Sequence, residues 1–314
     1  MIGIIIIFST VSHYVCLQAQ GQWKALNPEQ ALFIYTRCQE DNLPSGPSRA
    51  EYITNWHQFK LEPNDAITQC YTKCALEGLG VYDGKDKEFR SNRIITQHEA
   101  YRSIIGANDD EVAQFKQAVS ELNAGSGSCA DVYNAYLPVH NRFVGVIRQL
   151  YHGTVEGVAK IYAADPSIKK KGESYFAYCE KRVYGDSNKD DLCKARQYEL
   201  TGSAQLKDSI DCIFRGLRYM NENGINVDEI VRDFKLVNKG DLEGNVKLTL
   251  LKCRGGRAYD YYTCLVNSEM KEDFKKAFDF REVRSANYAY LVQGKVYDPA
   301  SVAAEVAKAD ATVC

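Results

Sequence analysis

The residues of this chain that are best suited to chemistry are its cysteines. Two of them stand four positions apart in the stretch CYTKC, Cys70 to Cys74. Such a pair could be half of a metal site, a redox pair, or two separate disulfide anchors. A zinc site needs more ligands nearby, and the sequence has no Cys-x-x-Cys and no histidines at metal spacing. A thioredoxin-type pair has two intervening residues, whereas this one has three. We therefore expect anchors, with no metal and no cofactor.

The segment around CYTKC is typical of a helix, with Pro63 at its start and Gly78 at its end. On a helix, the Cβ atoms of residues i and i+4 lie ~5–6 Å apart, while a disulfide needs ~3.5–4.5 Å. Cys70 and Cys74 should therefore bond not to each other but to neighbouring helices. The pairs that we predict are Cys38–Cys74 and Cys70–Cys129.

The N-terminal stretch MIGIIIIFSTVSHYVCLQAQ carries no charged residue and has an apolar run near its start. We predict a signal peptide over residues 1–19, cleaved near Ala19–Gln20, and hence a secreted protein. The alternative is a buried N-terminal strand. Loss of the signal removes Cys16 from the 11 cysteines and leaves an even number, which is typical of a secreted chain with disulfides.

The composition is that of a globular protein, with 45% hydrophobic and 25% charged residues. A net charge of −2 provides no basic field to collect phosphates, so we expect no nucleic-acid partner. Apolar runs stay below the ~18 residues that span a bilayer, so we expect no membrane partner either. The expected oligomeric state is a monomer.

Helix patterns recur along the chain, and sustained alternating strand patterns are scarce, so we predict an all-α fold. With 314 residues, the chain exceeds what one small core usually needs. The polar stretch ADPSIKKKG, residues 164–172, is the expected boundary. It divides the chain into a domain of residues 20–164 and a domain of residues 165–314.

An internal repeat relates the two predicted domains. The spacing from Cys38 to Cys70 is nearly that from Cys179 to Cys212. In this alignment Gly216 stands where Cys74 stands in the first copy, so the second copy must pair its cysteines differently. The remaining predicted pairs are Cys179–Cys212, Cys193–Cys314 and Cys253–Cys264.

This pattern resembles the long-form D-seven salivary proteins of blood-feeding mosquitoes, anopheline ones above all, within the insect odorant-binding superfamily. The likeness covers essentially the whole mature chain, and it rests on the ten-cysteine framework, on WHQF before CYTKC, and on KKKGESYFAYCEKR at the junction. It implies two disulfide-bridged odorant-binding-like helical domains and a secreted, non-enzymatic protein of saliva that sequesters host mediators. The ligands implied are cysteinyl leukotrienes and thromboxane A2 in the N-terminal domain and, in many members, biogenic amines in the C-terminal domain. Their removal would limit platelet aggregation, vasoconstriction and inflammation.

An eicosanoid site should be an apolar tunnel with a few polar groups. The candidate lining residues are Ile53, Trp56, Phe59, Tyr71, Tyr133, Tyr136, Leu137, Phe143, Val144, Ile147 and Tyr151. The resemblance implies that Tyr71 hydrogen-bonds a ligand hydroxyl and that Thr54 and Trp56 lie at the tunnel mouth. The candidates for contact with the ligand carboxylates are Tyr151, His152, Lys169, Lys170 and Lys171. The alternatives are ordinary core positions for the aromatic residues and a solvated linker for the lysines.

The predicted C-terminal domain departs from the amine-binding pattern of the resembling family. An ungapped alignment places Ala286 and Ala289 where amine-binding relatives carry two acids, and Arg215 where they carry a histidine. We therefore expect weak or absent amine binding. The alternative is that another acid takes this role after a small shift, and the candidates are Glu269, Asp279 and Glu282.

Two further classes of function compete with ligand sequestration. An enzyme would need a catalytic base, and the sequence shows no Gly-x-Ser-x-Gly, His-Glu-x-x-His or Walker motif. A protein–protein inhibitor of haemostasis would act through exposed loops, for which DNLPSGPSR and AGSGS are candidates. We favour sequestration of a small lipid.

Overall fold

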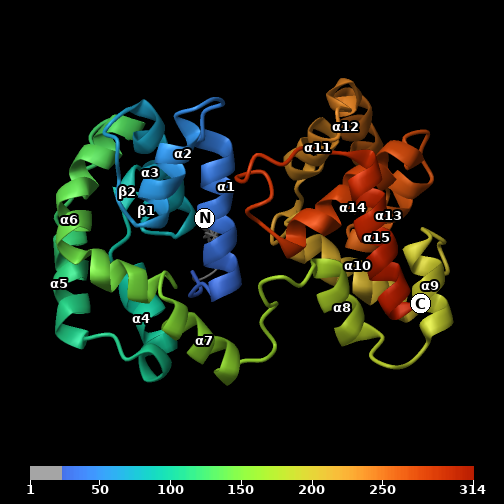
Figure 1. Cartoon of the computed structure of the whole chain (residues 1–314), viewed down its shortest axis with the longest axis horizontal. Helices are drawn as coiled ribbons and strands as arrows, with labels where there is room; N and C mark the ends of the chain where they lie inside the picture. The colour runs from blue at the N-terminus through green and yellow to red at the C-terminus, as the bar shows by residue number, and fades with distance from the viewer. Residues whose placement is uncertain (1–22) are drawn as a thin grey trace, which may run out of the picture.

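A computed structural model describes residues 23–314, and the predicted signal peptide lies outside them. The described chain is mainly helical, which confirms the all-α prediction, and Figure 1 shows two helical bodies side by side. None of the helices within residues 23–314 has the length and apolar character that crossing a bilayer requires.

The N-terminal half, residues 23–164, contains seven helices and a two-stranded antiparallel hairpin. Its elements are α1 (Pro28–Asn42), α2 (Arg49–His57), α3 (Ala66–Gly78), β1 (Tyr82–Asp83), β2 (Glu88–Phe89), α4 (Asn92–Ile105), α5 (Asp109–Ser120), α6 (Cys129–Leu150) and α7 (Val155–Ala164).

The C-terminal half, residues 165–314, has a similar composition of elements. They are α8 (Tyr175–Val183), α9 (Lys189–Arg196), α10 (Ala204–Gly216), β3 (Met220–Asn221), β4 (Gly224–Ile225), α11 (Val227–Leu236), the 3-10 turn η1 (Gly240–Leu242), α12 (Glu243–Lys252), α13 (Ala258–Val266), α14 (Lys271–Ala286) and α15 (Pro299–Val313).

Local sequence fixes where the helices that build the site begin. Asn27 forms a capping box with Gln30 at the start of α1, and Pro28 occupies the first helical position. The Asp65 carboxylate accepts the backbone N–H of Thr68 at 2.9 Å and so caps α3. These caps satisfy backbone donors that have no partner inside the helix.

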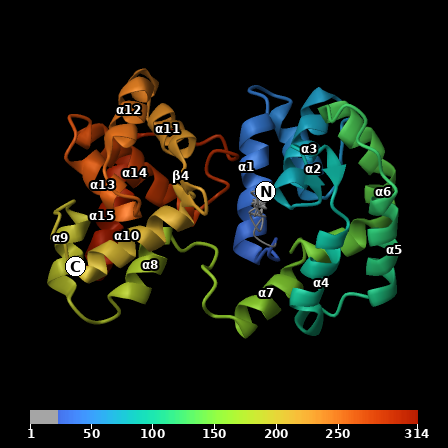
Figure 2. The same cartoon turned by 180° about the vertical axis from the view of Figure 1, so that it is seen from behind.

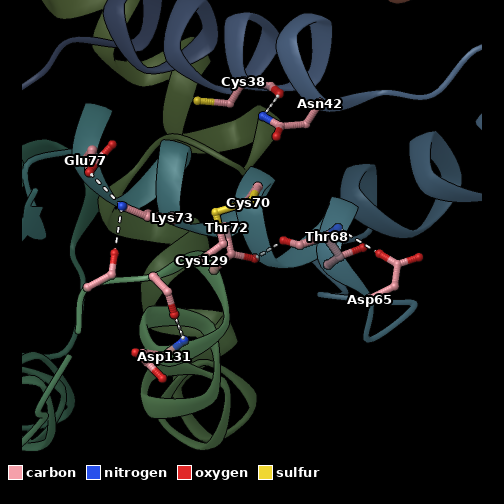
Figure 3. The surroundings of a disulfide bond; sticks show 12 residues. Cys38, Asn42, Asp65, Thr68, Cys70, Thr72, Lys73, Glu77, Cys129 and Asp131 are labelled. Carbon is pink, nitrogen blue, oxygen red and sulfur yellow. Dashed lines mark hydrogen bonds and ion pairs between the residues drawn. A yellow bond between two sulfur atoms is a disulfide. The ribbon is translucent and has the colours of Figure 1, made fainter. Parts of the chain in front are cut away.

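The described chain contains five disulfides, and they are the same five pairs that the sequence suggests. Cys38–Cys74 ties α1 to α3, and Cys70–Cys129 ties α3 to α6. Figure 3 shows the Cys70–Cys129 bond, close to which Lys73 donates to the carbonyl of Gly127 at 2.7 Å. The helix that carries CYTKC is therefore linked covalently to a neighbour on each side.

The two halves have separate hydrophobic cores. One cluster consists of buried residues between Ala31 and Tyr151, and the other of buried residues between Tyr175 and Val302. This separation supports a boundary between α7 and α8, close to the predicted position. The halves face each other across α1, as Figure 2 shows from behind.

Both halves contain the same motif, but one of its contacts differs between them. In both, a 13-residue helix that carries a disulfide is followed by a short antiparallel hairpin. At Gly216, the counterpart of Cys74, a Cβ atom would overlap the ring of Tyr175. An aromatic ring from α8 thus lies against α10 where the first half has a second covalent link.

We expect Gly216→Ala to destabilise the protein by about 1–3 kcal/mol, because the added methyl group overpacks against Tyr175. Urea unfolding followed by far-UV circular dichroism measures the change. Gly244→Ala in α12 is the matched control, since a Cβ there meets no atom within 4 Å, and it should be neutral or stabilising. Equal effects of the two substitutions would contradict this account of Gly216.

Candidate ligand-binding site

The N-terminal half encloses a cavity of about 230 Å³. Its walls come from α1, α2, α3, α6 and the segments that follow α2 and α6. The lining residues are Leu32, Tyr35, Thr36, Gln39, Trp56, His57, Phe59, Leu61, Tyr71, Thr72, Ala75, Leu76, Leu79, Tyr136, His140, Ile147, Tyr151, His152 and Gly153. Aromatic and aliphatic groups predominate, which is the usual character of a small-molecule site.

Trp56 and Tyr71 form one wall of this cavity. Their rings are stacked with centroids 3.9 Å apart and planes 4° apart. The Trp56 indole N–H donates to the Thr68 hydroxyl at 3.3 Å, so the polar edge of the indole is satisfied inside α3. The stack is both buried core and cavity wall, which the sequence treated as alternatives.

Several tyrosine hydroxyls lie within the apolar cavity. Burial raises the pKa of Tyr35, Tyr71, Tyr136 and Tyr151, so all four remain protonated at neutral pH. Within residues 23–314, the hydroxyls of Tyr35 and Tyr151 are buried without a hydrogen-bond partner. Such groups are costly to bury alone, and a ligand oxygen in the cavity would satisfy them.

Two histidines in the cavity wall are neutral at physiological pH. His140 Nε2 lies 2.8 Å from the carbonyl oxygen of Phe59, and His152 Nε2 lies 2.7 Å from that of Leu26. Burial lowers the pKa of both imidazoles, more than these hydrogen bonds raise it. His152 is therefore an uncharged polar group of the cavity wall.

The three predicted lysines have different environments. Lys169 is 3% exposed, and its ammonium donates to the carbonyls of Glu173 at 2.9 Å and Ser285 at 3.1 Å. Burial lowers its pKa to about 8. Lys170 and Lys171 are exposed. Burial and then the charge of Lys171 lower the pKa of His57, which lines the cavity.

The structure brings together four of the eight predicted ligand-binding residues. Trp56, Tyr71, Tyr151 and His152 line the cavity. Thr54 is exposed on α2, and its hydroxyl donates to the carbonyl of Ala50, so it does not belong to the wall. The buried Lys169 is not the solvated linker residue that the alternative reading proposed, nor does it line the cavity.

The wider set of predicted lining residues is divided in the same way. Phe59, Tyr136 and Ile147 line the cavity, but five other candidates do not: Ile53, Tyr133, Leu137, Phe143 and Val144. None of the cavity-lining residues of α1 was predicted from the sequence. A single helical face is formed by Leu32, Tyr35, Thr36 and Gln39, at positions i, i+3, i+4 and i+7. Because two of these residues are polar, the pattern does not indicate a buried face.

One cavity inside the C-terminal half measures about 30 Å³, which corresponds to roughly one water molecule. Asp279 and Glu282 line it, whereas Ala286 and Ala289 do not, and Glu269 is exposed. Of the alternative acids, Asp279 and Glu282, one turn apart on α14, are therefore the two that face this cavity.

The acids of this small cavity already have partners. Arg196 pairs with Glu180 at 2.7 Å and with Glu282 at 3.0 Å, and Asp279 accepts the Tyr198 hydroxyl. Burial nevertheless raises the pKa of Glu282 to about 7. Arg215, in contrast, is exposed and pairs with Asp211 at 2.8 Å.

The disulfide-linked helices around an apolar cavity define a small-molecule-binding protein of the insect odorant-binding type. In agreement, the model of the PBP/GOBP family matches residues 162–268. The chain is 59% identical over 300 residues to the long form salivary protein D7L1 of Anopheles atroparvus, covering 96% of this chain and 95% of that one.

Solved structures agree with this relationship. The complex of AnSt-D7L1 with U46619 matches with a TM-score of 0.88 and 59% identity, over 91% of this chain and 97% of the other. The complex of AeD7 with leukotriene E4 matches with a TM-score of 0.81 and 36% identity, over 88% and 96%. The chain therefore belongs to the long-form D7 family of secreted salivary proteins.

We expect acidification to destabilise the N-terminal half partly through His140. Its pKa is below the ordinary value of 6.5 in the folded state. Below pH ~6.5 the unfolded chain therefore takes up a proton that the folded chain resists, and stability is lost as the pH falls. His140→Gln keeps a donor for Phe59 and should lose less stability between pH 7.5 and 5.5, by up to about 1.4 kcal/mol per pH unit.

Urea unfolding followed by tryptophan fluorescence tests this, because both tryptophans lie in the N-terminal half. An identical loss of stability in the wild type and the variant would exclude His140 as a contributor.

Proposed function

We propose that this protein sequesters eicosanoids, namely cysteinyl leukotrienes and thromboxane A2 or its analogues, in the cavity of its N-terminal domain. The observation that carries the proposal is the enclosed aromatic cavity of about 230 Å³ with unpaired buried hydroxyls. Two relatives of the same fold are described as complexes with U46619, a thromboxane analogue, and with leukotriene E4.

The cavity suits one part of such a lipid in particular. Its volume equals roughly eight water molecules at ~30 Å³ each, enough for an apolar tail but not for a whole leukotriene conjugate. The tail would contact Trp56 and Phe59, and a hydroxyl along it would pair with Tyr71, Tyr35 or Tyr151. The carboxylate end would then lie near His57, where the charge of Lys171 is available.

Binding of this kind removes one ligand per site without turnover. A leukotriene conjugate of roughly 40 heavy atoms at ~0.3 kcal/mol per atom allows about 12 kcal/mol, which corresponds to nanomolar affinity. His140 and His152 both hydrogen-bond to backbone carbonyls rather than to a nucleophile, which supports a binder over an enzyme. Lower local eicosanoid levels would reduce platelet aggregation, vasoconstriction and inflammation.

Calorimetric titration with leukotriene E4 and U46619 tests the proposal. Each should bind with about one site per chain. If neither binds the wild type, while the protein instead blocks a haemostatic protein, a protein–protein inhibitor replaces the eicosanoid scavenger.

Tyr71→Phe should weaken the binding of U46619 by ~0.5–1.5 kcal/mol, because it removes one hydrogen bond to a ligand hydroxyl and keeps the ring stacked on Trp56. Tyr261→Phe in the C-terminal half provides the matched control and should leave the affinity unchanged. An unchanged affinity in Tyr71→Phe would mean that the phenol does not contact the ligand hydroxyl.

Serotonin and histamine should show no submicromolar binding in the same calorimeter. The cavity that contains Asp279 and Glu282 holds about 30 Å³, and Arg196 occupies the place of a ligand ammonium. Clear submicromolar binding of either amine would show that this site opens and exchanges Arg196 for the ligand.

A further inference from the structure

Helix α1 is a wall shared by the cavity and by the contact between the two halves. Its inner face lines the cavity. Its outer face carries Glu29, Phe33, Arg37 and Glu40, which contact residues of the C-terminal half. Figure 2 shows α1 on the side of its half that faces the other half. Thr36 borders both the cavity and a small gap at this contact, so a single side-chain layer separates the two.

Two arginines of the C-terminal half hold the outer face of α1 near its two ends. Near the start, Arg218 Nη2 contacts the Glu29 carboxylate at 3.1 and 3.2 Å, and its guanidinium lies 3.8 Å from the centre of the Phe33 ring. Near the end, Arg232 Nη2 contacts Glu40 at 3.0 Å, and its other terminal nitrogen pairs with Asp41.

The charges between these two points form a continuous buried network. Arg37 Nη1 donates to Glu229 at 2.8 Å, and Arg281 contacts the same carboxylate at 2.7 Å. Arg284 pairs with Asp233 at 2.9 Å and reaches Glu40 at 3.3 Å. Since Asp233 is 1% exposed, α11 and α14 present these groups from a rigid, dry surface.

A network of this kind restrains the position of α1. Charged hydrogen bonds are strong in a low-dielectric interior, and a buried charge that loses its partner is costly. The outer face of α1 cannot move away without leaving several carboxylates and guanidiniums unpaired. The inner face, which belongs to the same rigid helix, is held at the same time.

We propose that the C-terminal half is part of the lipid-binding device, and that Arg218 and Arg232 are positioning residues that keep the α1 wall closed over the ligand. This inference rests on the proposed function. Neither arginine lines the cavity. Their loss should therefore act on ligand release through α1 and not through a ligand contact.

The test compares rates of ligand release. Arg218→Met with Arg232→Met removes both charges and keeps the aliphatic stems, while Glu29 retains the Tyr288 hydroxyl and Glu40 retains Arg284. The matched control is Arg215→Met with Arg257→Met, two exposed arginines that pair with Asp211 and Asp208 in the C-terminal half. Excess U46619 displaces leukotriene E4 while tryptophan fluorescence is recorded.

We expect the interface pair to release leukotriene E4 about 2- to 30-fold faster, the range that couplings of ~0.5–2 kcal/mol produce, and the control pair to match the wild type. Hydrogen exchange of the α1 amides should rise in the interface pair alone. In a chain that carries Arg218→Met, Arg232→Lys keeps the positive charge and should release the ligand more slowly than Arg232→Met does.

Unchanged release in the folded interface pair, or equal acceleration in the control pair, would overturn the inference. Should the double variant not fold, Arg232→Met alone decides, because this side chain is 27% exposed and its partners keep other contacts. Binding by the wild type distinguishes a failure of this inference from a failure of the proposed function. If the wild type binds no eicosanoid, the proposed function is refuted, and there is no release rate to compare.

Discussion

The cavity depends on the two disulfides that leave α3 toward α1 and α6. An apolar void of about 230 Å³ forfeits packing contacts worth about 5–6 kcal/mol at ~24 cal/mol per Å³. Without restraint, the surrounding side chains would move inward to recover them. Cys38–Cys74 and Cys70–Cys129 close loops of 36 and 59 residues, and each bridge is worth about 4 kcal/mol by loop entropy. Covalent bracing therefore outweighs the cost of keeping three helical walls apart.

The polar groups inside this braced space define what it can accept. Burial keeps the phenols of Tyr35, Tyr71 and Tyr151 protonated and keeps His140 and His152 neutral. These wall groups thus offer hydrogen bonds but no charge, while the positive charge of Lys171 lies near enough to His57 to lower its pKa. An amphipathic lipid with a hydroxylated tail and an anionic head has the complementary arrangement.

The second copy of the repeat has a similar set of helices but a differently packed interior. Where the first copy has a second disulfide on its central helix, Gly216 admits the ring of Tyr175. Around it, the rings of Phe214, Tyr262 and Phe278 pack against one another with centroids about 6 Å apart. The interior leaves a cavity of only about 30 Å³ among these groups, and its buried arginines pair with carboxylates of the same half or of α1. The C-terminal half thereby becomes a support for the ligand-binding half.

The features that depend on local geometry, such as cysteine pairing and helix content, could be predicted from the sequence. The spacing of Cys70 and Cys74 on one helix excluded a bond between them, and the helix patterns and cysteine framework identified the fold. The family resemblance singled out Trp56 and Tyr71 as ligand-binding candidates. Only the tertiary structure decided which face of α1 lines the cavity, that Lys169 is buried, and that Asp279 and Glu282 share the small cavity of the C-terminal half. The physical reason is that α1 is covered on both sides, by apolar groups on one and by paired charges on the other. Periodicity reveals a buried face only when the opposite face is in water.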